Sequence, residues 1–190
     1  MKKTALVIGA TGLIGRALVD ELLAKETISR VITLTRRSLV IDHKKFENQV
    51  VDFSQLDQYQ DYFNNIDVFF SCLGTTKQQA GSIAQQRVVD LDYQYHAAKL
   101  ARNVGSNEYF LVSSSAASAR SFSPYLKMKG ELEDKVIELG FQRCVIFRPS
   151  LLIGQREQRR AGELLAGKLM RFLDLHLQIW LQGSCLLILN

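Results

Sequence analysis

The chain has 190 residues, of which 47% are hydrophobic and 23% are charged, and its net charge at neutral pH is +5. These values are typical of a single globular domain, and neither a membrane-spanning apolar run nor a signal-peptide pattern is present. The basic residues form no block of five or more, so we expect no nucleic-acid partner. Three cysteines without metal-ligand spacing indicate no metal site and a reducing, cytoplasmic compartment.

The N-terminal segment predicts a strand, a glycine turn and a helix in that order. The apolar residues 5–8 indicate a buried parallel strand, and a helical pattern of apolar residues covers 18–23. Between them, Gly9, Gly12 and Gly15 have the spacing G-x-x-G-x-x-G. They are expected to allow the turn, the approach of a pyrophosphate and the packing of the helix, respectively. This stretch resembles the phosphate-binding corner of extended and atypical short-chain dehydrogenase/reductases; a glycine turn without a ligand is the alternative.

A second strand is predicted over residues 30–35, and it ends in Arg36 and Arg37. A site specific for NAD carries an Asp or Glu near this point, where the carboxylate accepts hydrogen bonds from the ribose 2′-hydroxyl. Guanidinium groups instead bind a phosphate through paired, charge-assisted hydrogen bonds. The sequence therefore favours NADP(H) over NAD(H) as the cofactor, with a solvated strand end as the alternative.

The next segment predicts a loop over residues 39–48, a short third strand over 49–53 and a helix over 55–63. In the enzymes that the chain resembles, an acidic residue at the end of this strand binds the adenine amino group. Asp52 is the candidate for that role. N-capping of the following helix by Ser54 is the competing role for this turn.

A fourth strand is predicted over residues 67–73, and the loop after it contains Gly74 and Thr75. Ligands of an open α/β sheet approach the carboxyl ends of its strands. Leu73, Gly74 and Thr75 are therefore expected beside the ribose and the pyrophosphate. The polar residues 77–86 are predicted to form a surface loop at the border of this cleft.

A long helix is predicted over residues 87–104, and a fifth strand over 109–112 leads into the serines at 113–115. His96 lies within the helix. A single helical histidine is more often a core or surface residue than a catalytic base, and His96 is interpreted in that way.

The sequence around Tyr125 predicts an acid–base group. Pro124 suits the first position of a helix, and Lys129 lies one turn beyond Tyr125 on the same face. A phenol ionises too far above neutral pH to exchange protons well, but a nearby ammonium group and an oxidised nicotinamide would lower its pKa. Tyr125 is then the candidate acid–base residue and Lys129 its activator. A serine hydroxyl, from Ser114 or Ser115, would hold the substrate carbonyl oxygen.

Together these motifs resemble the atypical, NAD(P)-binding short-chain dehydrogenase/reductases, in particular the Tat-interacting oxidoreductase-like proteins and their bacterial relatives. The resemblance covers about residues 3–172. It includes Gly-Ala-Thr-Gly from Gly9, Cys-Leu-Gly-Thr-Thr from Cys72 and Tyr-Leu-x-x-Lys-Gly-Glu from Tyr125. It implies that NADPH is contacted by Thr11, Gly12, Leu13, Ile14, Arg36, Arg37, Leu73, Gly74, Tyr125 and Lys129, with Leu152 and Arg160 closing over the nicotinamide half and the phosphates. Relatives keep only the first two of the three serines, and Ser114 is preferred to Ser115 as the catalytic one.

The C-terminal segment departs from that resemblance. Relatives continue beyond residue 150 through a proline-containing loop, a short strand and a final helix, whereas residues 173–190 are apolar and contain no proline. We therefore expect residues 150–190 to form a short, truncated or altered substrate-side segment. A second copy of the chain, or another partner protein, is then expected to cover its apolar end.

We predict one NAD(P)-binding domain over residues 1–190 with an α/β fold, a Rossmann-like doubly wound parallel sheet with helices on both faces. The predicted function is an NADP(H)-dependent oxidoreductase that transfers hydride to or from a small carbonyl or alcohol. The alternative is an NADPH-binding redox sensor or partner-binding protein with little turnover. A nucleotide-sugar epimerase ranks third, because such enzymes need a larger C-terminal domain.

Overall fold

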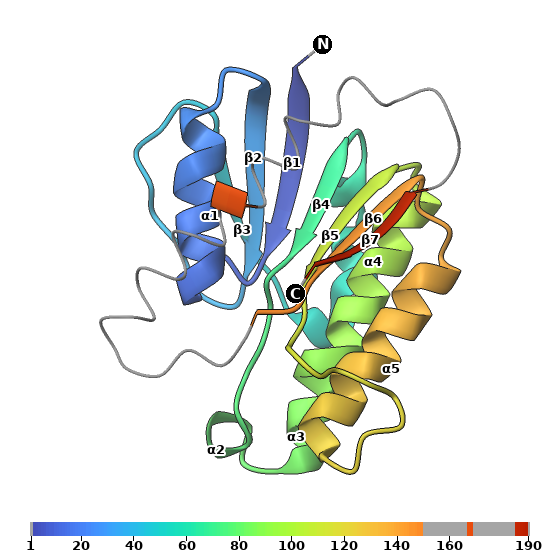
Figure 1. Ribbon diagram of the computed structural model, residues 1–190. Coiled ribbons are helices and arrows are strands. Elements are labelled where there is room, and N and C mark those ends of the chain that lie inside the picture. Colours follow the sequence, from blue (N-terminus) through green and yellow to red (C-terminus); the bar gives the residue numbers. More distant parts are fainter. Residues whose placement is uncertain (1, 150–166, 169–184, 190) are drawn as a thin grey trace.

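The computed structural model of the chain describes residues 2–149, 167–168 and 185–189. Its centre is a parallel sheet of seven strands in the order β3-β2-β1-β4-β5-β6-β7 (Figure 1). The strands are β1 (Lys3–Ile8), β2 (Ile28–Thr35), β3 (Phe46–Val50), β4 (Val68–Ser71), β5 (Glu108–Val112), β6 (Arg143–Phe147) and β7 (Cys185–Leu189). The order reverses between β1 and β4, which is where an open α/β sheet binds its ligand. This arrangement confirms the predicted doubly wound parallel sheet.

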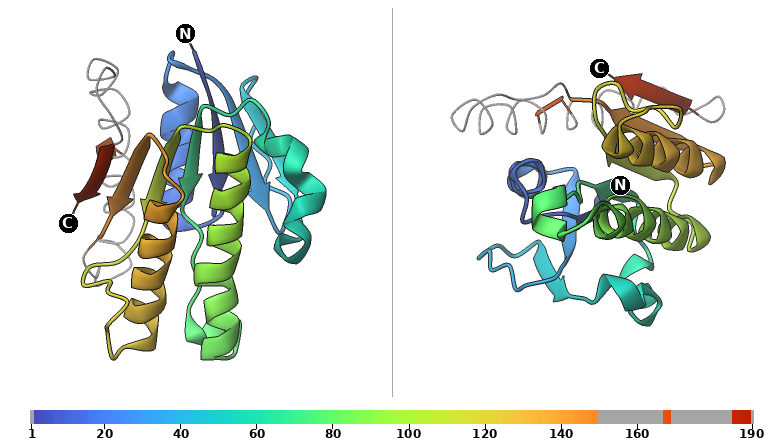
Figure 2. Two further views of the ribbon diagram at one scale, coloured as in Figure 1. Left: turned by 90° about the vertical axis from the view of Figure 1, so that its right-hand side faces the viewer. Right: turned by 90° about the horizontal axis from the view of Figure 1, so that it is seen from below.

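Helical segments cover both faces of the sheet (Figure 2). They are α1 (Leu13–Ala24), η1 (Phe53–Phe63), α2 (Lys77–Ala80), α3 (Ile83–Arg87), η2 (Val88–Asp92), α4 (Tyr93–Asn103) and α5 (Pro124–Glu138). Successive strand residues point to opposite faces, so Ala5 and Val7 pack with α1, whereas Leu6 and Ile8 pack with η1, α4 and α5. Burial on both faces explains why β1 has a continuous apolar sequence instead of an alternating one.

The third strand lies earlier than predicted. The sequence indicated residues 49–53, but β3 covers Phe46–Val50 and pairs in parallel with Val31–Thr35. β3 is an edge strand whose side chains are only partly buried, so it needs no apolar run. Its polar residue Asn48 donates hydrogen bonds to Thr35 Oγ1 at 2.7 Å and Thr33 Oγ1 at 2.9 Å. Because its residues are polar, this strand was not predicted at its observed position. Side-chain hydrogen bonds help to stabilise it.

Residues 77–80 and 83–87 form α2 and α3, so the predicted loop over residues 77–86 is wrong, although the stretch does border the cleft as predicted. Thr76 caps α2 by accepting a hydrogen bond from Gln79 N at 3.2 Å, and Ser82 caps α3 by accepting one from Gln85 N at 3.1 Å. A Ser or Thr followed three residues later by Gln is the sequence pattern of a helix start. Both helix starts could therefore have been predicted from the sequence.

The helices predicted over residues 55–63 and 87–104 are present with different backbone geometry. The first is the 3₁₀ segment η1, in which Gln55 and Tyr59 have non-helical backbone angles. The second begins with the π-helical segment η2, which carries the buried residues Asp90 and Leu91, and continues as α4. Apolar spacing identified these elements, but it does not encode their hydrogen-bond pattern.

Residues 185–189 add an edge strand to the sheet, since β7 pairs in parallel with β6 along its whole length. Residues 150–190 were expected to form a short, truncated or altered segment, and residues 185–189 of that segment form a regular strand next to β6. Between residues 150 and 184, only 167–168 are described, and they are helical. None of the described helices is both long enough and apolar enough to cross a membrane.

Candidate active site

The turn between β1 and α1 requires glycine at two positions for packing. Gly9 has a φ of +80°, and a Cβ atom there would lie 2.3 Å from the carbonyl carbon of Cys72. A Cβ atom at Gly15 would lie 2.2 Å from the Gly9 carbonyl oxygen. At Gly12 a Cβ atom would meet only that same oxygen, at 3.3 Å, which is a tight contact but no overlap, and the residue is exposed. The strand and the helix therefore come close at Gly9 and Gly15, while the backbone is exposed at Gly12.

Gly12 faces a pocket of about 890 Å³ at the switch point between β1 and β4. Of the residues predicted to bind the cofactor, the pocket is lined by Gly9, Thr11, Gly12, Arg36, Arg37, Asp52, Leu73, Gly74 and Thr75. It is not lined by Leu13, Ile14, Gly15, Tyr125 or Lys129. Leu152 and Arg160 lie outside the described residues. The structure thus brings the predicted phosphate-side residues together in one cavity.

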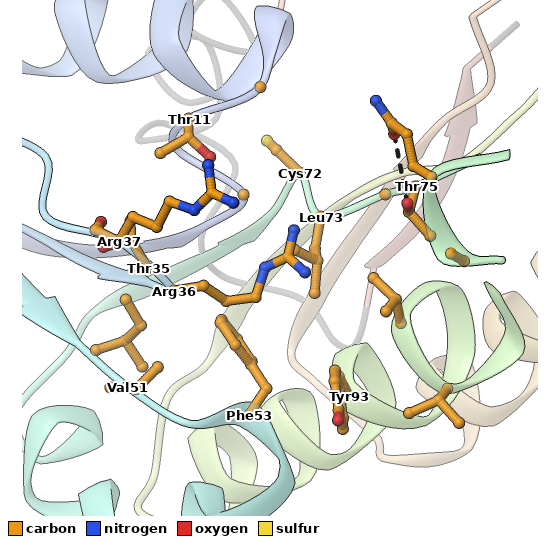
Figure 3. Close-up of a pocket in the computed structure, with 18 of the residues that line it drawn as sticks. Thr11, Thr35, Arg36, Arg37, Val51, Phe53, Cys72, Leu73, Thr75 and Tyr93 are labelled. Carbon is orange, nitrogen blue, oxygen red and sulfur yellow. Dashed lines mark hydrogen bonds between the residues drawn. The ribbon is translucent and has the colours of Figure 1, made fainter. Parts of the chain in front are cut away.

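Arg36 and Arg37 enter this pocket from the end of β2. Arg37 points toward Thr11, and Arg36 extends below Leu73 toward the centre of the pocket (Figure 3). Both side chains are exposed, and neither forms an ion pair within the part of the chain that the structure describes. Their positive charge is therefore available to an anionic ligand.

A buried hydrogen-bond network holds the turn that carries these arginines. Asn48 Nδ2 donates to Thr35 Oγ1 at 2.7 Å, and Thr35 Oγ1 in turn donates to the carbonyl oxygen of Arg37 at 2.7 Å. Asn48 Oδ1 accepts a hydrogen bond from Leu39 N at 2.9 Å. Asn48 therefore connects β3 to both sides of the arginine turn without lining the pocket.

Asp52 also lines the pocket and caps η1. Its Oδ1 accepts hydrogen bonds from Ser54 N at 2.9 Å and from Ser54 Oγ at 2.7 Å, and these bonds lower the pKa of the Asp52 carboxyl. The capping role expected of Ser54 thus belongs to Asp52, which remains exposed on the pocket wall. The next residue, Phe53, is buried and stacks on Tyr93 with 5.8 Å between ring centroids.

A further wall of the pocket comes from α2 and α3, within the stretch that was predicted to border the cleft, and from η2 and α4, which sequence reasoning did not place there. Its residues are Gln79, Ala80, Gln85, Val88, Val89 and Tyr93. A hydrogen bond of 3.4 Å from Thr75 Oγ1 to Gln79 Oε1 joins α2 to the loop after β4 (Figure 3). The capping pattern at Thr76 and Ser82 would have predicted helices here, whereas the lining by Val88, Val89 and Tyr93 is seen only in the tertiary structure.

The serines after β5 occupy different environments. Ser113 is buried, and its hydroxyl has no hydrogen-bond partner among the described atoms. Ser115 is exposed and donates its backbone N–H to the carbonyl oxygen of Pro149 at 3.0 Å. The Ser114 hydroxyl donates to the carbonyl oxygen of Ser115 at 3.4 Å, and the Ser114 side chain also lies close enough to Tyr125 to lower the pKa of the phenol. Of the two predicted catalytic serines, Ser114 is therefore the one in position to share a substrate oxygen with Tyr125.

Lys129 lies one helical turn from Tyr125, as expected, but it does not lower the pKa of the phenol. Burial raises the pKa of Tyr125, and the nearby Ser114 side chain opposes this effect. Lys129 is fully enclosed, and its Nζ donates to the carbonyl oxygen of Val112 at 3.4 Å. Its own pKa is lowered by burial. The predicted activation of Tyr125 by Lys129 is therefore not seen in the protein alone.

His96 and Cys72 also have reactive side chains, but their surroundings do not indicate a catalytic role. His96 forms a surface contact of 2.9 Å with Asp57, in agreement with its interpretation as a non-catalytic residue. Cys72 lines the pocket, but burial raises the pKa of its thiol to about 12. Among the described residues, no group of three His, Cys, Asp or Glu side chains is arranged to hold a metal ion.

The strand order, the glycine turn at the switch point and the Tyr125–Lys129 pair define a Rossmann protein of the short-chain dehydrogenase/reductase type. The model of the NAD dependent epimerase/dehydratase family matches residues 5–186, and the chain belongs to this family. Protein HTATIP2 of Rattus norvegicus is 41% identical over 169 residues, which are 87% of this chain and 69% of that protein. Protein fmp52, mitochondrial, of Emericella nidulans is 36% identical over 84% of this chain and 71% of its own length. The resemblance to Tat-interacting oxidoreductase-like proteins is thereby confirmed.

Solved structures share the fold at low sequence identity. MoeE5 in complex with UDP-glucose and NAD has a TM-score of 0.74 at 18% identity, over 98% of this chain and 76% of MoeE5. At this identity the likeness supports the fold and not the substrate.

The expected cytoplasmic location is wrong as a general assignment, because several fungal relatives are named mitochondrial. The prediction depended on unpaired cysteines and on the absence of a signal-peptide pattern. Free thiols are compatible with any reducing compartment, so cysteine usage does not distinguish one from another.

Proposed function

We propose that the protein is an NADP(H)-dependent oxidoreductase that transfers hydride to or from a small carbonyl or alcohol. The observation that carries the proposal is the group formed by Ser114, Tyr125 and Lys129 at the carboxyl end of the sheet. Lys129 interacts electrostatically with Cys72, which lines the nucleotide pocket, so this group lies close to that pocket. The oxidoreductase activity and the preference for NADP(H) go beyond family membership.

The pocket suits the adenosine and pyrophosphate part of a dinucleotide. The exposed backbone at Gly12 and the N-terminus of α1 offer N–H groups to phosphate oxygens. Arg36 and Arg37, without carboxylate partners among the described residues, suit the 2′-phosphate of NADP(H). Asp52 and Phe53 offer a carboxylate and an apolar ring to the adenine.

The residues outside that pocket suit the chemistry at a carbonyl. A bound nicotinamide would supply or accept the hydride. Ser114 would donate a hydrogen bond to the substrate oxygen, and Tyr125 would give a proton to that oxygen or take it back. Because burial raises the pKa of Tyr125, the phenol is protonated at neutral pH and suits the direction in which a carbonyl is reduced.

Binding measurements test the cofactor preference. We expect NADPH to bind more tightly than NADH, and Arg36→Ala/Arg37→Ala to weaken NADPH binding by about 10- to 100-fold while changing NADH binding little. Lys99→Ala removes an exposed positive charge on α4 and serves as the control. Equal affinity of the wild type for both cofactors would refute the preference for NADP(H).

An NADPH-binding sensor with little turnover is the second candidate. The observation that favours it is the contact of Lys129, whose Nζ donates to the carbonyl oxygen of Val112 and which is not among the groups that lower the pKa of Tyr125. A screen of small aldehydes and ketones with NADPH separates the two candidates. An oxidoreductase should lose about 10²- to 10⁴-fold in rate in Tyr125→Phe, whereas a wild type that binds NADPH and turns over no carbonyl would favour the sensor.

A further inference from the structure

Asp90 is a carboxylate with no exposure to solvent, located in the π segment η2. Its Oδ1 accepts a hydrogen bond from Thr75 N at 2.9 Å, and its Oδ2 accepts one from Gln86 Nε2 at 3.1 Å. Both donors are neutral, so neither balances the negative charge. A buried carboxylate is stable in its ionised form only when a cation compensates it.

A buried cation lies in the same region of the protein. Lys129 is 3% exposed and belongs to α5, which packs against η2. The carbonyl oxygen of Val112, to which its Nζ donates, is also neutral. The groups that act electrostatically on Lys129 are Asp90, Glu133 and Cys72.

Two of these three groups do not provide a free negative charge. Glu133 accepts two hydrogen bonds from Arg148, at 3.1 and 2.6 Å, so its charge is already matched. Cys72 is a neutral thiol at neutral pH, because burial raises its pKa to about 12. Asp90 is therefore the carboxylate left to balance Lys129 among the residues that the structure describes.

Asp90 also supports the wall of the nucleotide pocket. Its bond to Thr75 N holds the loop after β4, and a Cβ atom added to Gly74 would lie 3.5 Å from Asp90 Oδ1. Gly74 and Thr75 both line the pocket. One carboxylate thus connects the pocket wall with the region of the acid–base group.

We propose that Asp90 is a positioning residue, which supplies the counter-charge of Lys129 and holds the Gly74–Thr75 wall of the nucleotide pocket. The inference depends on the proposed function only where it treats Lys129 as part of an acid–base group. Burial lowers the pKa of Lys129, and Asp90 is the first of the charges that oppose this effect. Its negative charge also raises the pKa of Tyr125, as expected for a charge close to both residues.

Nuclear magnetic resonance of lysine-labelled protein tests the counter-charge directly. The Lys129 Nζ signal, assigned by its loss in Lys129→Met, is followed against pH in the wild type, in Asp90→Asn and in Asp92→Asn. Asp92 is an exposed carboxylate in the same segment η2 and is the matched control. We expect Asp90→Asn to move the Lys129 titration to lower pH and Asp92→Asn to leave it in place. An unchanged Lys129 titration in Asp90→Asn would overturn the proposal that Asp90 balances the charge of Lys129.

Titration with NADPH tests whether Asp90 holds the Gly74–Thr75 wall of the nucleotide pocket. Asp90→Asn keeps a side-chain oxygen that can accept the hydrogen bond from Thr75 N, whereas Asp90→Ala removes it. We expect NADPH affinity to fall at least about tenfold in Asp90→Ala and less than about threefold in Asp90→Asn. Wild-type affinity in Asp90→Ala would overturn the role of Asp90 in the pocket wall.

If Asp90→Asn does not fold, measurements on the wild-type protein test the pairing of Asp90 with Lys129. The Asp90 ¹³Cγ and Lys129 ¹⁵Nζ signals of a charge pair must respond together as either group titrates, and independent titrations would overturn the pairing. These measurements need no cofactor. A wild type that binds no NADPH would refute the proposed function and leave the result for Lys129 intact.

Discussion

Gly9 and Gly12 differ in what an added methyl group would meet, and this difference gives a sharp prediction. In Gly9→Ala, a φ of +80° costs about 1–2 kcal/mol. The methyl would lie 2.3 Å from the Cys72 carbonyl carbon, roughly 1 Å inside a normal carbon contact. Relieving that overlap costs about 1–3 kcal/mol and weakens the Cys72 N to Ile8 O hydrogen bond of 3.0 Å between β4 and β1. We expect Gly9→Ala to lower the free energy of unfolding by about 2–5 kcal/mol.

Gly12→Ala is the matched control, because the position has an extended φ of −78° and only the Gly9 oxygen nearby. We expect its free energy of unfolding to stay within about 1 kcal/mol of the wild type. Its NADPH affinity should nevertheless fall at least about tenfold, since the methyl stands where the phosphate would approach. Urea unfolding followed by circular dichroism, together with NADPH fluorescence titration, measures both quantities. Equal unfolding midpoints for Gly9→Ala and the wild type would refute the steric argument.

Three further predictions concern residues around the pocket. Glu133→Gln leaves Arg148 without its carboxylate partner and should destabilise the protein by about 3 kcal/mol in thermal unfolding. Cys72 should resist iodoacetamide at pH 8 in the native protein, because a thiol with a pKa near 12 is protonated there and the thiolate is the reactive form. Asn48→Ala should weaken NADPH binding about 3- to 10-fold, although Asn48 does not line the pocket, because the arginine turn loses its anchor.

Each of these predictions has its own control. Glu138→Gln removes an exposed carboxylate from the same helix α5, and a loss as large as that of Glu133→Gln would argue against the buried pair. Peptide mapping after alkylation in urea should find Cys72 modified, whereas rapid native modification would contradict its burial. Gln49→Ala changes the neighbouring residue of β3 and should leave NADPH affinity intact. Unaltered NADPH binding in Asn48→Ala would show that the turn carrying Arg36 and Arg37 keeps its conformation without the Asn48 side chain.

The sequence was sufficient for the elements whose requirements are local. A strand buried on both faces must be apolar, so β1, β2, β4 and β5 were predicted close to their observed positions. The glycine spacing predicted the turn because a Cβ atom would overlap neighbouring backbone atoms at Gly9 and at Gly15. Arg36 and Arg37 were predicted at the pocket because the carboxyl end of β2 must lie beside that of β1.

Tertiary structure alone decided three features of the site. Val88, Val89 and Tyr93 line the pocket from the start of the long helix, and the apolar spacing of that helix does not specify which side chains reach the cavity. Lys129 lost its expected effect on Tyr125 because it is buried with its ammonium group toward Val112. Asp90 had no distinguishing mark in the sequence. Its importance comes from burial, since only a carboxylate removed from water needs a particular cation to balance its charge.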